Sequence, residues 1–252
     1  MNDIEPNIRI DVDPTNPGQF FACCGLLELA DRLWPGAEGW FEEGGCTFFI
    51  RGTGLLPELI SALNVTRINS SLTEEEIASL RSLLNSGKNA SDDSLVEGGQ
   101  LKLKWKRERI HLSEPFDLSI DWWSDDKSGG SSLKTWAGKQ LILDNVRALQ
   151  RALQHELDDA SINVRLFDRT ARVDGVPLYF DSHQNWQSTP RDIGCNLFAL
   201  RNVIPATSTT RPLLELASFV GLQRFRPEFL KSEKLLRYSL WTTPLPIAVA
   251  GV

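Results

Sequence analysis

The sequence predicts an α+β fold, in which a mainly antiparallel sheet with hairpins packs against several helices. Short runs of alternating apolar and polar residues, such as Asn7 to Asp13, recur between helix-like segments. The dipeptide Asp174-Gly175 stands between two strand-like runs, 164–173 and 176–180, and favours a tight hairpin turn. Strands and helices also do not alternate regularly, as they would in a parallel sheet built from βαβ units.

One buried helix is expected near the N-terminus. Asn16 is a suitable N-cap, Pro17 suits the first helical position, and Gln19 completes a capping-box arrangement. Between Phe20 and Trp34 only three residues are charged, and they share one narrow stripe. Gly25 lies in the middle of this helix, where glycine costs about 1 kcal/mol relative to alanine. We therefore expect another backbone to pass close to Gly25.

The elements that follow are shorter. The sequence predicts strands at 40–41 and 46–50, a helix at 55–63, a helix that starts with a Thr73–Glu76 capping box, and a surface loop at 88–99. A long central helix is expected over 132–157 and an apolar helix over 212–221, capped near Thr209 or Thr210. The segment 237–249 is strand-like but contains two prolines, which favour an edge strand.

Two runs with opposite charge are predicted to form a hairpin. Residues 101–106 alternate apolar residues with Lys102, Lys104 and Lys106, whereas 117–122 alternate them with Asp117, Ser119 and Asp121. Cross-strand pairing between the lysines and the aspartates is one interpretation. Phosphate binding by the lysines is the other, and the sequence does not separate the two.

The chain has 252 residues, of which 41% are hydrophobic and 24% charged, so it can bury one large core. We expect a single domain over 1–252, or two tightly packed lobes over 1–99 and 100–252. The sequence has neither a signal peptide nor an apolar run that spans a bilayer, which predicts a cytoplasmic protein without a membrane partner. Four cysteines at positions 23, 24, 46 and 195 stand in apolar contexts without metal-ligand spacing, so all four are predicted to be buried.

Charge is distributed unevenly around a net value of -6. Residues 1–60 contain ten acidic and three basic residues, whereas 160–226 contain eight arginines, no lysine and five acidic residues. This asymmetry is compatible with an ordinary solvated surface. The sharper interpretation is an acidic face for protein partners and an arginine-rich face for phosphate.

The loop after Asp181 concentrates polar side chains. Asp181 and His183 are possible metal ligands, but no further ligand completes the set, and no motif of a nucleophilic or phosphate-binding enzyme is present. We therefore expect no catalytic residue, metal or cofactor, and keep a metal-dependent hydrolase that uses Asp181 and His183 as an alternative.

The same loop is better suited to binding nucleic acid. Gln184, Asn185 and Gln187 offer paired donors and acceptors for base edges, Trp186 offers a stacking face, and Arg191 can reach phosphate or guanine. The other interpretation is a loop whose polar groups satisfy one another.

The segment 122–139 is the second candidate. It contains a Gly-Gly pair and leads into a helix that carries Lys134 and Lys139, a combination that favours an anion such as nucleic-acid phosphate.

Three blocks together resemble the large-subunit-like proteins of subtype I-U (I-G) CRISPR systems. They are DPTNPGQFFACCGLLELADRLW at 13–34, DWW at 121–123 followed by KTWAGKQ at 134–140, and RPLLELASFVGLQRFRP at 211–227. The resemblance implies a non-catalytic subunit of the Cascade complex, in which guide RNA pairs with the target and protein recognises a short flanking motif. It also implies partners: other Cascade subunits, CRISPR guide RNA, target double-stranded DNA and a recruited helicase-nuclease.

The resemblance does not identify the contact residues, so these come from the loop chemistry. The predicted nucleic-acid-binding residues are His183, Gln184, Asn185, Trp186 and Gln187 in one loop, and the cations Lys127, Lys134, Lys139, Arg191, Arg201 and Arg211. A structural scaffold that contacts proteins through its acidic N-terminal region is a further alternative.

Overall fold

The computed structural model describes residues 5–85, 92–123, 141–153, 166–168, 170–173, 178, 180–181, 208–230, 232–233 and 235–251. Helices and antiparallel sheets are interspersed within these residues, so the predicted α+β class is confirmed. The buried apolar side chains form one cluster that runs from Ile8 to Ile247 and draws on both halves of the chain. No helix in the described ranges is long and apolar enough to cross a bilayer.

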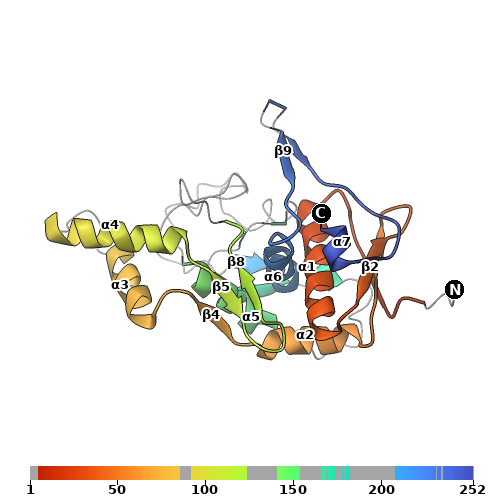
Figure 1. The fold of residues 1–252 in the computed structure, drawn as a ribbon, viewed down its shortest axis with the longest axis horizontal. Helices are drawn as coiled ribbons and strands as arrows, with labels where there is room; N and C mark the ends of the chain where they lie inside the picture. Colours follow the sequence, from red (N-terminus) through yellow and green to blue (C-terminus); the bar gives the residue numbers. More distant parts are fainter. Residues whose placement is uncertain are drawn as a thin grey trace.

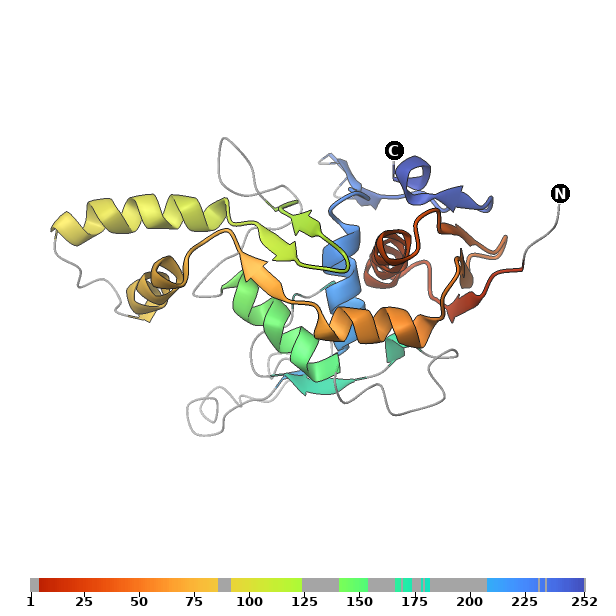
Figure 2. The ribbon, with the colours of Figure 1, turned by 60° about the horizontal axis from the view of Figure 1, so that its bottom comes forward.

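Helix α1 (Pro17–Leu33) lies beside α6, between it and the strands near the N-terminus (Figures 1 and 2). Its first turn is closed by Asn16, whose side chain accepts a hydrogen bond from the Gly18 amide at 3.0 Å. Every residue from Gly18 to Ala30 is buried. Because its whole circumference is covered, this helix is the element around which the others pack.

Helix α6 (Pro212–Gly221) crosses α1 with the two backbones in contact, and all ten of its residues are buried. A Cβ atom placed on Gly25 would lie 1.9 Å from the carbonyl oxygen of Ala217. A Cβ atom on Gly221 would lie 2.0 Å from the carbonyl oxygen of Phe21. Only glycine fits at either position, and this explains the glycine in the middle of α1.

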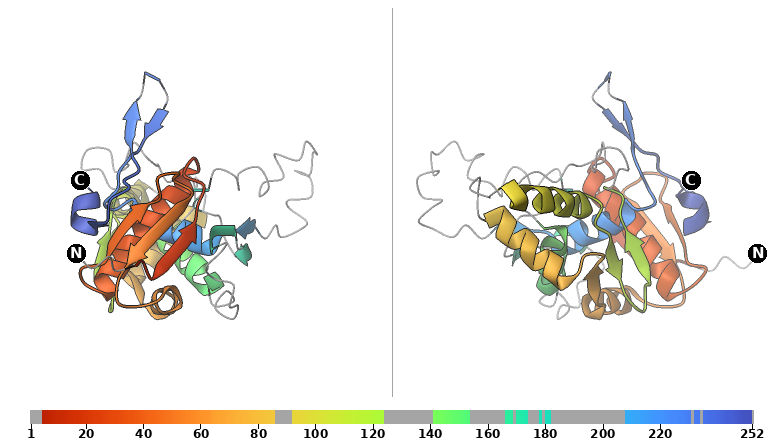
Figure 3. Two further views of the ribbon diagram at one scale, coloured as in Figure 1. Left: turned by 90° about the vertical axis from the view of Figure 1, so that its right-hand side faces the viewer. Right: turned by 60° about the vertical axis from the view of Figure 1, so that its left-hand side comes forward.

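A four-stranded antiparallel sheet lies on one side of α1 (Figure 3, left). It contains β1 (Ile8–Asp11), β3 (Thr47–Arg51), β2 (Glu38–Phe41) and β11 (Leu245–Pro246), in that order. Residues in β1 alternate between buried and exposed, as expected for a strand with one face on the core. The short helix α7 (Ile247–Ala250) follows β11.

The outward face of this sheet carries an aromatic pair. The rings of Trp40 and Phe49 lie on paired strands with centroids 5.4 Å apart. The guanidinium of Arg9 lies 5.6 Å from the Phe49 ring, and that of Arg51 lies 5.8 Å from the Trp40 ring. Such cross-strand contacts stabilise the sheet.

A second sheet contains β4 (Ile68–Ser70), β5 (Ile110–Leu112) and β6 (Leu118–Ile120), in that order. Helices α2 (Leu56–Val65) and α5 (Ile142–Leu153) contact each other near this sheet, and α5 also packs against α6. The second sheet and α5 complete the core on the side of α6 away from α1, whereas α2 also contacts α1 (Figure 2).

Two antiparallel hairpins project from this body in different directions (Figure 1). The first is a helical arm made of α3 (Glu74–Asn85) and α4 (Asp92–Lys106), which extends along the long axis of the molecule. The second is the strand pair β9 (Glu228–Leu230) and β10 (Leu235–Arg237). The predicted capping box of α3 is present, because Thr73 and Glu76 exchange hydrogen bonds of 3.0 and 3.1 Å.

The run 101–106 is helical, so the strand predicted there is wrong. It forms the end of α4, and β6 pairs with β5 instead. Of the three alternating apolar residues only Trp105 is buried, whereas Leu103 is 55% exposed. The alternation therefore did not mark a half-buried face, and the high helix propensity of leucine and lysine prevailed. The loop predicted over 88–99 is also wrong from Asp92 onward, where α4 begins.

Three smaller predictions need correction. The predicted strand over 164–173 is shorter, because Leu166–Asp168 form a 3₁₀ turn and β7 (Ala171–Val173) pairs with β8 (Ser208–Thr210). The predicted turn at Asp174-Gly175 lies outside the described ranges, and Leu178 and Phe180 are not in a strand. Cys46 is exposed, whereas Cys23 and Cys24 are buried as predicted. Of the predicted helix 132–157, the structure describes α5 (Ile142–Leu153) and Leu141, which precedes it; 132–140 and 154–157 lie outside the described ranges.

Candidate nucleic-acid interface

The described ranges include only one of the predicted nucleic-acid-binding residues, Arg211 at the N-cap of α6. The others lie outside them: Lys127, Lys134, Lys139, His183, Gln184, Asn185, Trp186, Gln187, Arg191 and Arg201. Asp181, the first residue of the predicted binding loop, is described.

Asp181 lies where the N-termini of α1 and α6 meet. Its side chain and that of Asn16 are both 0% exposed. The Asn16 amide donates a hydrogen bond of 2.8 Å to one carboxylate oxygen of Asp181, and the Arg211 guanidinium is ion-paired with the other. The Asp181 charge is thus compensated by an amide and a cation inside the protein.

Glu215 on α6 extends this polar cluster. One of its carboxylate oxygens accepts hydrogen bonds from the backbone amides of Phe180 at 3.1 Å and Asp181 at 3.4 Å. One turn further along α6, the Ser218 hydroxyl donates a hydrogen bond of 2.7 Å to the carbonyl of Gly18 on α1. These contacts tie the segment at 180–181 and the two helices together.

The environment of Asp181 does not favour the hydrolase alternative. A hydrolytic metal needs an open coordination position for water, and the Asp181 carboxylate is enclosed by Asn16 and Arg211. His183, its predicted partner, is outside the described ranges. Arg211 is engaged with the same carboxylate and its side chain is only 22% exposed, so its role in the described structure is charge compensation rather than contact with solvent.

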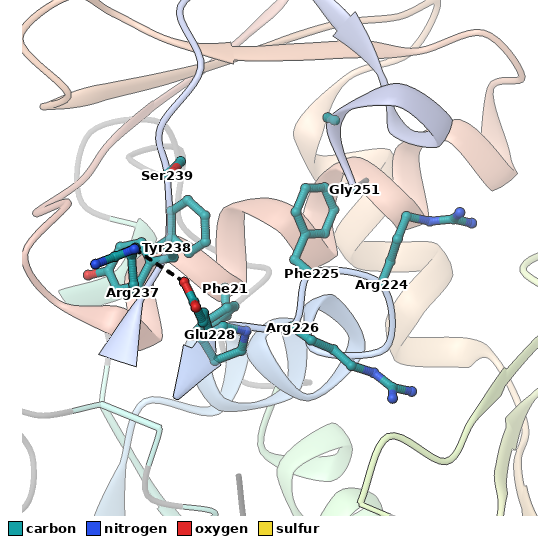
Figure 4. Close-up of a pocket in the computed structure, with 12 residues that line it drawn as sticks. Phe21, Arg224, Phe225, Arg226, Glu228, Arg237, Tyr238, Ser239 and Gly251 are labelled. Carbon is teal, nitrogen blue, oxygen red and sulfur yellow. Dashed lines mark hydrogen bonds and ion pairs between the residues drawn. The ribbon is translucent and has the colours of Figure 1, made fainter. Parts of the chain in front are cut away.

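A pocket opens at the base of the β9–β10 hairpin, with a cavity volume of about 440 Å³ (Figure 4). It is bordered by the start of α1, the segment that leaves α6, both strands of the hairpin and the end of α7. Its side chains are mainly aromatic and cationic: Phe20, Phe21, Phe225 and Tyr238, with Arg224, Arg226 and Arg237.

The aromatic rings of the pocket are held firmly in place. Tyr238 stacks on Phe20 with centroids 4.4 Å apart, and its hydroxyl donates a hydrogen bond of 2.8 Å to the carbonyl of Pro14. Burial, assisted by the nearby charge of Asp13, raises the pKa of Tyr238, so the hydroxyl remains protonated at neutral pH. Phe225 stacks on Trp241 at 5.5 Å. Phe20, Phe21 and Phe225 are only 2%, 5% and 8% exposed, so the half-buried Tyr238 is the ring that a planar ligand can reach.

Arg224 is anchored by an ion pair with Glu28 of α1, with 2.8 Å between nitrogen and oxygen. Burial disfavours the charged form of Glu28, but hydrogen bonds from Arg224 and Arg32 outweigh this and lower its pKa. Glu28 is therefore ionised at neutral pH, and it fixes the Arg224 side chain at the edge of the pocket.

The other two pocket arginines, Arg237 and Arg226, differ in how closely they are bound to other protein groups. Arg237 lies 3.4 Å from Glu228, and both side chains are mostly exposed. Arg226 is exposed and has no ion pair or side-chain hydrogen bond to the described residues. The guanidinium groups of Arg224 and Arg226 lie on one side of the aromatic rings, and that of Arg237 lies on the other (Figure 4).

This combination suits an anion attached to a planar group. The lining contains three arginines and one carboxylate, that of Glu228, so the pocket is net cationic even with Arg224 paired to Glu28. Arginine binds phosphate through paired N–H donors, and aromatic rings stack on nucleobases. The arrangement therefore fits a nucleotide within a nucleic-acid strand better than it fits an uncharged ligand.

The sequence interpretation missed this pocket. Its cationic signal was visible in Arg224 and Arg226, which belong to the arginine-rich stretch that ends at residue 226. Arg237 and Tyr238 lay in a segment interpreted only as a strand. The fold assembles residues almost the whole chain apart, from Phe20 to Gly251, and no local pattern encodes that convergence.

No group of three histidine, cysteine or acidic side chains is close enough to bind a metal in the described ranges. The chain matches no protein-family model, no curated protein sequence and no solved structure.

Proposed function

We propose that this chain is a non-catalytic subunit of a type I CRISPR RNA-guided DNA surveillance complex (Cascade), of subtype I-U (I-G), acting in antiviral defence in the cytoplasm. The observation that carries the proposal is the pocket of fixed aromatic rings and three arginines beneath the β9–β10 hairpin. Within the complex the subunit contributes to target DNA and guide RNA binding and to recognition of the flanking motif (PAM).

The sequence blocks that resemble the Cascade proteins coincide with the elements that build this pocket. The first block contains α1 and contributes Phe20 and Phe21, and the last contains α6 and contributes Arg224, Phe225 and Arg226. This agreement supports the proposal, because the recognised segments and the candidate site belong to one structural unit.

The middle block packs against the same unit. The indole nitrogen of Trp122 donates a hydrogen bond of 2.9 Å to the carbonyl of Phe219 on α6, and Trp123 stacks on the Phe219 ring at 5.2 Å. All three blocks therefore meet at α6.

The proposed division of labour follows from the chemistry of each part. The pocket arginines hold strand phosphates, and the half-buried ring of Tyr238 supports a base. Gln184, Asn185 and Gln187 remain the proposed readers of base edges, with Trp186 stacking beside them. The partners are the other Cascade subunits, the guide RNA, the target duplex and the recruited helicase-nuclease.

An assembled complex with and without this subunit tests the proposal. Affinity for a target duplex is measured with the correct flanking motif and with a scrambled one. We expect omission to weaken target binding at least tenfold and to remove the preference for the motif. Full affinity with an unchanged preference, in a complex whose other subunits are all present by mass, would rule the proposal out.

A scaffold role is the second candidate, and the outward face of the β1-β3-β2-β11 sheet favours it. Trp40, Phe49, Arg9 and Arg51 are of residue types enriched at protein interfaces. If this face binds a neighbouring subunit, the double variant Trp40→Ala and Phe49→Ala will drop out of the complex. If it does not, the variant will assemble normally.

A further inference from the structure

The C-terminal end of α4, where the helical arm joins the body, carries an unusual density of positive charge. Residues 102–109 contain five exposed cations: Lys102, Lys104, Lys106, Arg107 and Arg109. Trp105, which is 9% exposed, packs into the core and fixes this part of α4. The whole chain has a net charge of -6, so this stretch is much more positive than the rest of the protein.

The helical conformation spreads these cations around one side of the arm. At about 100° per residue, Lys102, Lys104, Lys106 and Arg107 occupy an arc of roughly 200° opposite Trp105. A strand would instead have placed the three lysines in one row facing Asp117 and Asp121, which flank β6. The basic surface of residues 102–107 thus wraps around the arm, which projects from the body (Figures 1 and 3).

The aspartates that were candidate partners of the lysines bind other groups. Asp121 is 3.2 Å from Arg109, and Asp117 is 3.5 Å from His111. Lys104 pairs with Glu76 of α3 at 2.5 Å. Lys102 and Lys106 have no ion pair with the described residues. Lys102 and Lys106 are therefore the cations of this stretch whose charge is not offset by an ion pair with the described residues.

We propose that the C-terminal part of α4 is a second nucleic-acid contact, in which Lys102, Lys106 and the neighbouring cations bind backbone phosphates of duplex DNA. Lys102 and Lys106 are about one turn apart, roughly 6 Å along the axis of α4, and lie on the same side of the helix. Each strand of duplex DNA carries a phosphate about every 3.4 Å along the axis, so the two lysines can reach phosphates of one backbone. The regular row of phosphates on a duplex therefore suits this pair.

The contact is independent of sequence. The exposed positions from 102 to 107 hold four cations and Leu103, with no amide or aromatic side chain that could read a base. Glu108, the carboxylate next in sequence, is 1% exposed and hydrogen-bonded to Ser70 at 2.6 Å, so it does not face the DNA. The inference stands on the charges of the arm and does not rest on the proposed role in Cascade.

Salt dependence of binding tests the inference. The full chain is titrated with a labelled duplex of random sequence at several salt concentrations, as wild type and as the double variant Lys102→Gln, Lys106→Gln. Each lost phosphate contact reduces the slope of log K against log salt by about 0.9, so we expect a decrease of about 1.8. The variant Lys102→Arg, Lys106→Arg should retain the wild-type slope.

A matched control removes two charges elsewhere. Arg67 and Arg151 are exposed and lie outside both the arm and the pocket, so Arg67→Gln with Arg151→Gln should leave the slope within about 0.5 of wild type. An equal loss in this control would overturn the inference, as would an unchanged slope in the lysine variant or no duplex binding by wild type at 50 mM salt. Equal affinity for polyglutamate would assign the surface to acidic protein instead. None of these outcomes decides the Cascade proposal, which depends on the assembled complex.

Discussion

The helix pair α1/α6 and the two projections differ in almost every physical property. Every residue of α6 is buried and α1 is buried from Gly18 to Ala30, with backbones so close that only glycine fits at Gly25 and Gly221. The α3–α4 arm and the β9–β10 hairpin instead present arginines and lysines to solvent. The sequence blocks that resemble the CRISPR proteins therefore lie mainly in the buried helix pair, whereas the charges available to a ligand lie on the projections and on the segment that joins α6 to the hairpin.

The difference predicts where substitutions act. Changes in the helix pair should alter the free energy of unfolding and remove binding only through loss of the fold. Changes in the projections should alter binding and leave unfolding almost unchanged, because exposed side chains contribute little to stability.

The largest effect is expected at the helix crossing. Gly25→Ala places a methyl group on the Ala217 carbonyl, which must move α6 away from α1. We expect a loss of about 4 kcal/mol or more, enough to leave little folded protein. Chemical denaturation measures the change. Gly44→Ala is the control, because a Cβ there meets nothing within 4 Å and the expected change is below about 0.5 kcal/mol.

The next effect is expected at the polar cluster. Asp181→Asn removes the charge that compensates Arg211 while keeping the shape of the side chain. Breaking a buried pair from one side costs about 3 kcal/mol. The same denaturation experiment checks it, and a change below 0.5 kcal/mol would show that the pair does not stabilise the junction of α1 and α6.

Glu108, at the base of the arm, is expected to make the free energy of unfolding depend on pH. Burial, opposed by the Ser70 hydrogen bond and aided by the charge of Asp144, raises the pKa of Glu108 from 4.5 to about 7. Between these values the folded chain keeps a proton that the unfolded chain has lost. The stabilisation that comes from keeping Glu108 protonated in the fold is therefore complete below pH 4.5. It decreases as the pH rises to about 7 and is absent above that pH.

Glu108→Gln isolates that contribution, because glutamine preserves the contact with Ser70 and does not titrate. Relative to wild type, the variant should gain up to about 3 kcal/mol between pH 5 and pH 8. A constant difference between the two proteins across this range would show that Glu108 titrates normally.

The α1/α6 helix pair was the part of the fold that the sequence predicted best. Asn16 predicts the N-cap, Pro17 predicts the first turn, and Gly25 predicts the close approach of another backbone. Each residue type meets a local steric or hydrogen-bonding requirement of that position. The end of α4 was misread, because alternation of leucine and lysine fits a strand and a helix equally well until burial is known.

The pocket was the part of the structure that the sequence predicted least well. Its arginines are ordinary in sequence, and only the fold brings Arg226 and Arg237 beside Phe20 and Phe21 of α1. A site assembled from both ends of a chain leaves no local pattern, whereas the polar loop at 183–187 attracted attention because its pattern is local.

The most direct test of the account is target binding by the assembled complex with Arg226→Ala and Arg237→Ala in this subunit. The account predicts a loss of about tenfold or more in affinity for the target duplex, since charge-assisted hydrogen bonds contribute about 1.5–3 kcal/mol each. Assembly and thermal stability should be unchanged, and the control Arg67→Ala with Arg151→Ala should bind like wild type. Wild-type affinity in the pocket variant would contradict the claim that this pocket holds nucleic acid.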